Sequence, residues 1–125
     1  MIYGLLMPCR LVQVIDAATY VVSLPGQIEI TVHLAGVEPI GITPPETISQ
    51  IETQISGAKS LACWLPQPKH DRGWFLGLRP GCSFAGDVYL ASESLSEKLA
   101  SESIVVRLQG NKEWQASEWV QTWQL

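Results

Sequence analysis

Cationic and aromatic side chains occur together in the segment 69–84, which contains Arg72, Trp74 and Arg79. Arginine side chains can follow a phosphate backbone and aromatic rings can stack on bases, which is the combination that single-stranded nucleic-acid sites use. The same aromatic residues could instead fill a hydrophobic core. The segment therefore predicts either a nucleic-acid contact or a packed, strand-rich region.

Composition limits the function classes. Lys and Arg number 8 against 12 Asp and Glu, which gives a net charge of −4. A protein held on nucleic acid by bulk attraction would carry the opposite sign, so that class is excluded while a local basic site stays open. With 125 residues, of which 46% are hydrophobic, the chain can bury the core of one domain. Disorder is thereby excluded as its main state.

The cysteines Cys9, Cys63 and Cys82 are odd in number and widely spaced, and they form no CxxC motif. Neither a disulfide framework nor a zinc site is predicted, and buried free thiols fit a reducing cytosol. No apolar run is long enough to cross a bilayer, and the first eight residues lack a charged leader. We expect a soluble, cytoplasmic protein that binds no membrane, metal or other cofactor.

Alternating and β-branched segments predict strands over 11–16, 19–24 and 28–34. Two further strands are expected at 74–78 and 84–90, with a short extended segment at 104–108. Residues 35–45 contain three prolines and two glycines, which predicts a loop. The sequence pattern thus favours a strand-rich domain.

Three helices are expected. Apolar residues recur every three or four positions from Ile48 to Leu65, with Glu46 in the first turn and Pro66 at the end, which predicts one long helix. A short helix over 94–100 begins with a Ser94–Glu97 capping box. The segment 111–124 could form an amphipathic helix. We treat residues 1–125 as one domain, with strands and helices at about 9–108 and a tail at 109–125.

The tail is rich in tryptophan, with Trp114, Trp119 and Trp123 in the last 12 residues. These side chains could fill gaps where the tail docks on its own domain. They could also form a surface for a partner or a second subunit, since tryptophan anchors are common in binding hot spots. Glu113 and Glu118 stand where a membrane-surface helix would carry basic residues.

Three stretches resemble the staphylococcal-nuclease-like family. They are VIDAATYVV at 14–22, VHLAGVEP at 32–39, and GDVYL at 86–90 followed by SLSEKL at 94–99. The family carries a V-x-D-G-D-T turn, a V-R-L-x-G-I-D-x-P-E stretch and a G-R-x-L-G-x-V-Y-L strand that leads into a short helix. The resemblance covers about 9–108 and implies a mainly β fold. That fold is a five-stranded OB-fold Greek-key barrel with one long helix and one or two shorter C-terminal helices.

Nucleases of this family use a carboxylate-bound calcium ion and two arginines that stabilise the charged transition state. The resemblance places the first aspartate of the turn on Asp16, but the second, a metal ligand, falls on Ala18. The first arginine falls on His33, which cannot present a bidentate guanidinium. The next aspartate falls on Glu38, which could still ligate a cation.

The remaining catalytic positions also depart from the family. The second arginine falls on Ser83 or on Trp74, depending on the alignment, and neither residue is basic. The glutamate that orients the attacking water is missing after Pro39, although Glu46 would replace it if a loop insertion shifted the motif. Losing one transition-state arginine can cost about 10³–10⁵ in rate. The resemblance therefore implies a nuclease fold with a degenerate active site.

Three functions follow as hypotheses. The first is a catalytically inactive binding module for a protein or a nucleic acid, with His33, Arg72, Trp74 and Arg79 as binding residues. The second is a weak or altered phosphodiesterase that holds Ca²⁺ or Mg²⁺. The third is a structural subunit that assembles through its tail.

The phosphodiesterase hypothesis has its own residue set. It would use the side chains of Asp16, His33, Glu38 and Glu46 around the cation. Without any such function, His33 is a surface histidine and Asp16 is a turn former that bonds to nearby backbone amides. The separations between the three carboxylates therefore bear directly on this hypothesis.

Overall fold

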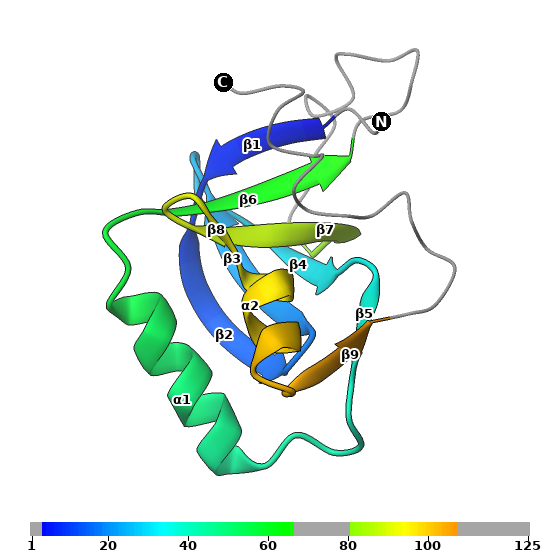
Figure 1. Cartoon of the computed structure of the whole chain (residues 1–125). Coiled ribbons are helices and arrows are strands. Elements are labelled where there is room, and N and C mark those ends of the chain that lie inside the picture. The colour runs from blue at the N-terminus through cyan, green and yellow to red at the C-terminus, as the bar shows by residue number, and fades with distance from the viewer. Residues whose placement is uncertain (1–3, 67–80, 108–125) are drawn as a thin grey trace.

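The computed structural model describes residues 4–66 and 81–107 (Figure 1). Over these ranges the chain is mainly β, with a mixed sheet and two helices. The expected strand at 74–78 and helix at 111–124 lie outside the described residues, as do the candidate binding and tail residues of those segments. Those residues are Arg72, Trp74, Arg79, Trp114, Trp119 and Trp123.

Among the described residues, five strands precede the first helix, and three more strands separate it from the second helix. They are β1 (Gly4–Pro8), β2 (Arg10–Asp16), β3 (Thr19–Leu24), β4 (Ile28–Leu34), β5 (Val37–Pro39), α1 (Pro45–Ser56), β6 (Leu61–Pro66), β7 (Ser83–Leu90), β8 (Glu93–Ser94), α2 (Leu95–Ser101) and β9 (Val105–Arg107).

The strands predicted over 11–16, 19–24 and 28–34 are confirmed as β2, β3 and β4. Alternation along β3 and β4 buries every second side chain, as the sequence pattern requires. A tight turn joins these two strands, in which the Gln27 N–H donates to the Leu24 carbonyl at 3.1 Å. Gly26 supplies the positive φ of 87° that the third position of such a turn needs.

The main sheet has the strand order β1-β6-β7-β4-β3-β2, and β8 pairs with β7. All pairs along this path are antiparallel except β4 with β7, which run parallel. The first and last strands of the path, β1 and β2, are consecutive in the chain and are separated only by Cys9. A separate two-stranded sheet joins β5 to β9.

The long helix predicted to reach Leu65 is wrong in its second half. Helix α1 ends at Ser56, where the Gly57 N–H caps it by donating to the Thr53 carbonyl. The apolar run that follows forms β6, between β1 and β7 (Figure 1). A continuous apolar run fits a buried strand as well as a buried helix. Here the ladder partners on both sides decided the outcome.

Two smaller expectations also change. The loop predicted over 35–45 contains β5, which pairs with the distant strand β9 so that Glu38 lies opposite Val106. Strand β1 was not predicted. The short second helix is confirmed as α2, and its cap is present because the Glu97 N–H donates to the Ser94 hydroxyl at 3.3 Å. The strand at 84–90 is confirmed as β7, and the extended segment at 104–108 contains β9.

One hydrophobic core joins the inner faces of the strands to both helices. Helix α1 lies against β2 and buries Ile51 and Ile55, while α2 contacts β7 and β9 and buries Leu95 and Leu99 (Figure 1). In the ranges 4–66 and 81–107, neither helix has the length and apolar character that crossing a membrane requires.

Candidate functional site

Small and polar side chains share the outward side of β3, β4 and β7. The strand registers place Thr19 opposite His33 and Val21 opposite Thr31, and the parallel pairing adds Ser83 beside Thr31. Directly paired residues project from the same face of a sheet. None of these side chains is buried, whereas their neighbours along β3 and β4 are. We call this surface the outer face, and its members are Thr19, Val21, Thr31, His33, Ser83 and Ala85.

His33 is the most versatile chemical group on the outer face. It is exposed, as its outward phase in the strand predicted, and its Nδ1 lies 3.3 Å from the Thr19 hydroxyl oxygen. This hydrogen bond orients the ring on the sheet surface. An imidazole can donate or accept a hydrogen bond, so His33 can recognise a polar ligand group.

The turn between β2 and β3 is held by its own side chains. Asp16 Oδ1 accepts a hydrogen bond from the Ala18 N–H at 2.8 Å, so Asp16 acts as the turn former that the sequence allowed. The Tyr20 hydroxyl donates to the Ala17 carbonyl at 2.7 Å. Burial, together with the nearby carboxylates of Asp16 and Asp87, raises the pKa of Tyr20 far above its usual value. Tyr20 therefore remains a neutral donor at physiological pH.

The candidate metal ligands do not converge. Ala18 is 7% exposed and presents only a methyl group at the turn. Glu38 is exposed on β5, and Glu46 is exposed in the first turn of α1. Among residues 4–66 and 81–107, no three His, Cys, Asp or Glu side chains form a group that could hold a metal ion. Asp16, Glu38 and Glu46 thus form no such group.

Asp87 is the prominent polar residue that the sequence pattern did not single out. Its carboxylate is fully buried and accepts hydrogen bonds from the Val88 N–H at 2.8 Å and from the hydroxyls of Ser94 and Ser96. Burial raises the pKa of Asp87 to about 6, although these hydrogen bonds oppose the rise. A single acidic residue inside the apolar run of β7 was the signal that could have revealed it.

Acidic residues outnumber basic ones in the described ranges. They contain four basic residues, Arg10, Lys59, Lys98 and Arg107, against nine acidic residues. Arg10 pairs with Ser23 and so lies at the border of the outer face. The surface that these ranges form is therefore not a phosphate-binding surface of the bulk electrostatic kind.

No model of a known protein family matches this sequence, and no curated protein matches it. The resemblance to staphylococcal-nuclease-like proteins accordingly stays a prediction.

Proposed function

We propose that this chain is a non-catalytic binding module, built on a barrel of the OB type, that binds a protein through the outer face. The observation that carries the proposal is the outer face itself. It joins three strands into a surface of small and polar side chains that are exposed or half-buried. The resemblance places the two nuclease arginines on His33 and on either Ser83 or Trp74, and none of these residues carries a guanidinium.

The barrel part of the proposal rests on the strand path. The path begins with β1 and ends with β2, and these two strands are continuous apart from Cys9. The Cys9 N–H donates to the Leu61 carbonyl at 3.0 Å, which carries the β1–β6 ladder up to the junction. One bent strand that pairs with β6 by its first half and with β3 by its second half would close the sheet. With β1 and β2 counted as one, the path over residues 4–66 and 81–107 counts five strands, the number that an OB-fold barrel requires, which supports the proposal.

The non-catalytic part rests on chemistry. A methyl group at position 18 supplies no oxygen to a hard cation, and an imidazole at position 33 supplies no guanidinium fork to a phosphate. Neither Ser83 nor Trp74, the two alternatives for the second arginine, carries a positive charge that could offset the charge of a phosphorane. Each change removes an interaction on which phosphodiester hydrolysis depends, and this supports a non-catalytic role.

A protein ligand fits the surface better than a nucleic acid. The six residues that define the outer face include no Phe, Tyr or Trp on which a base could stack, and acidic residues outnumber basic ones in the described ranges. Beside it, irregularities in the β2–β3 register coincide with Val12 and Ile15, which are 48% and 47% exposed. Protein interfaces bury apolar residues at their centre within a polar rim, so a partner that covers Val12 and Ile15 would have the outer face as part of its polar rim.

The test compares two variants of equal charge change. Thr31→Lys places a long cation in the centre of the outer face, and Gln50→Lys places one on the exposed side of α1. The probe is a protein that crosslinks to the chain and is then purified. We expect its affinity to fall at least tenfold for the outer-face variant and to be unchanged for the helix variant. Equal affinities would contradict the proposal.

A cleavage assay tests the non-catalytic part of the proposal. Cleavage of DNA or RNA with Ca²⁺ or Mg²⁺ that disappears in His33→Ala would overturn that part.

A nucleic-acid ligand is the second candidate, and the sequence observation that favours it is the group Arg72, Trp74 and Arg79. This function requires binding of single-stranded DNA or RNA that weakens with added salt and in Arg72→Ala or Arg79→Ala. Absence of binding at low salt would remove it.

A further inference from the structure

Two of the three cysteines are neighbours across one ladder. In the β1–β6 register Met7 lies opposite Cys63 and Pro8 opposite Ala62, and the Cys9 N–H bonds to the Leu61 carbonyl. Side chains alternate along a strand, so Met7 and Cys9 share a face with Cys63. Cys9 and Cys63 are therefore diagonal neighbours on the inner side of the sheet, although they lie far apart in the sequence.

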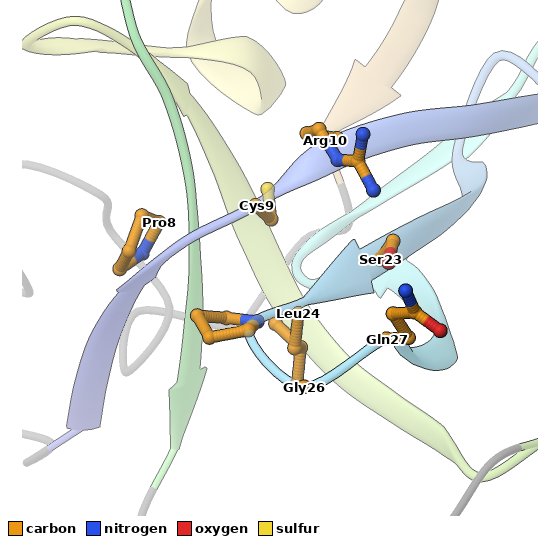
Figure 2. Close-up of a pocket in the computed structure, with 8 residues that line it drawn as sticks. Pro8, Cys9, Arg10, Ser23, Leu24, Gly26 and Gln27 are labelled. Carbon is orange, nitrogen blue, oxygen red and sulfur yellow. The ribbon is translucent and has the colours of Figure 1, made fainter.

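The two thiols differ in access. Cys63 is fully buried in the core. The neighbouring Cys9 thiol, together with burial, raises the pKa of Cys63 well above its usual value, so Cys63 stays protonated. Cys9 is half-buried and lines an open groove of about 240 Å³ together with Pro8, Arg10 and Leu24 (Figure 2). A small oxidant can reach Cys9 from this groove and cannot reach Cys63 directly.

Cys9 stands at the junction between two ladders. The chain changes partner there from β6 to β3, and the preceding Pro8 has no N–H to donate to a ladder. A disulfide needs Cα atoms no further apart than about 7 Å, a separation close to that of diagonal neighbours in an antiparallel pair.

We propose that Cys9 and Cys63 form a reversible disulfide in response to peroxide. The Cys9 thiolate attacks one oxygen of hydrogen peroxide, which breaks the O–O bond and gives Cys9 sulfenic acid and hydroxide. The Cys63 sulfur then attacks the Cys9 sulfur, and the departing hydroxyl leaves as water with the Cys63 proton. In total the two thiols lose two electrons and two protons, while peroxide is reduced to two molecules of water. A thiol reductant reverses the cross-link.

Cys82 provides an internal control. It is also half-buried, but it directly precedes β7, where its carbonyl accepts a hydrogen bond from the Thr31 N–H at 2.8 Å. Of the three cysteines that were expected to be buried, only Cys63 is. Cys9 and Cys82 are both half-buried, but only Cys9 has Cys63 as a neighbour. Exposure alone would oxidise Cys9 and Cys82 alike.

The experiment treats the full folded chain with hydrogen peroxide, denatures it, alkylates the remaining thiols and maps the peptides by mass spectrometry. We expect loss of two of the three thiols, a Cys9–Cys63 linked peptide, and full recovery with dithiothreitol. Cys82→Ser should give the same linked peptide. Three free thiols after peroxide, or a linked peptide that contains Cys82, would overturn the proposal.

Two variants separate the roles. In Cys63→Ala the reaction should stop at Cys9 sulfenic acid, which dimedone traps, and in Cys9→Ser the Cys63 thiol should remain unmodified. Circular dichroism before oxidation establishes that each variant is folded. Peroxide oxidation of Cys63 in a folded Cys9→Ser chain would contradict the proposed order of events. The peptide map of the unsubstituted chain decides the linkage even if a variant fails to fold.

Discussion

Ser96 contacts the Asp87 carboxylate twice, through its backbone N–H to Oδ1 at 3.2 Å and through its hydroxyl to Oδ2 at 3.2 Å. Asp87 belongs to β7 and Ser96 to the first turn of α2, so this double contact joins the sheet to the helix that follows it. The hydrogen bonds offset part of the cost of burying the carboxylate, yet its pKa stays raised because it is removed from water.

The raised pKa makes stability depend on pH. Asp87 has a pKa of about 6 in the folded chain against an ordinary value of 3.8, so the folded state holds an extra proton between these values. The free energy of unfolding should therefore fall as pH rises through this window, by roughly 3 kcal/mol for this group. Urea unfolding between pH 4 and pH 7 measures the slope. The Asp87→Asn variant should lack this fall, and identical slopes in the two proteins would refute the prediction.

Removing the carboxylate altogether should destabilise the fold. In Asp87→Ala the N–H groups of Val88 and Ser96 and two buried hydroxyls lose their acceptor, and we expect a loss of about 2–4 kcal/mol in the free energy of unfolding. Chemical denaturation provides the measurement. The control is Glu93→Ala, which removes an exposed carboxylate 3.5 Å from Lys98 Nζ and should cost about 0.5 kcal/mol or less. Equal losses would show that the hydrogen bonds to Asp87 contribute no more to the free energy of unfolding than the exposed carboxylate of Glu93 does.

Gly86 allows β7 and β6 to approach closely. A Cβ atom at this position would overlap the Trp64 carbonyl oxygen, a backbone atom that cannot rotate away. Gly86→Ala should therefore lower the free energy of unfolding by about 3 kcal/mol or more. Gly57→Ala is the matched control, because its Cβ would meet its nearest neighbour at 3.5 Å and its φ is −81°. Thermal melting compares the two, and a Gly86→Ala protein as stable as the control would be the contrary result.

Adding the second aspartate that the resembled nucleases carry should not create a metal site. Ala18→Asp places a carboxylate at a position that is 7% exposed, where we expect a loss of about 1–3 kcal/mol in stability. Because Asp16, Glu38 and Glu46 form no group that could hold a metal ion, we expect that calcium will neither raise the melting temperature of the variant nor produce cleavage of DNA. Differential scanning fluorimetry with and without calcium measures this. A calcium-dependent rise confined to the variant would support the phosphodiesterase hypothesis instead.

The oligomeric mass of the protein tests the hypothesis that the chain assembles through its tail. If the chain assembles through its tryptophans, the double variant Trp119→Ala/Trp123→Ala should have a smaller oligomeric mass than the unsubstituted chain, because large aromatic anchors dominate many interfaces. Light scattering after size exclusion gives the mass. An unchanged mass would count against a structural subunit that assembles through its tail.

Local patterns were enough for several elements. The alternation in β3 and β4 is visible in the sequence because one face of each strand is buried and the other is not. The capping box at Ser94 and Glu97 likewise specifies the start of α2 through atoms only three residues apart. Such features need no knowledge of the rest of the chain, and they were predicted correctly.

Sequence alternation predicted only part of the candidate site, and the pairing of distant strands decided the rest. Alternation alone placed His33 on the outward side of its strand. Its neighbour Ser83, however, comes from β7 through a parallel pairing that no local pattern encodes. The contact with Thr19 likewise depends on the register between β3 and β4. Strand partners far apart in sequence are chosen by the packing of the whole sheet, which explains why the outer face could not be assembled in advance.

The amino-acid sequence by itself determined which segments can form strands and capped helices, because propensity, alternation and capping act over a few neighbouring residues. Only the tertiary structure decided that the apolar run 61–66 is a strand, that Asp87 is held by α2, and that Cys9 meets Cys63. Each of these depends on a partner brought close by folding. The energies of ladder pairing, burial and hydrogen bonding exist only once that partner is in place.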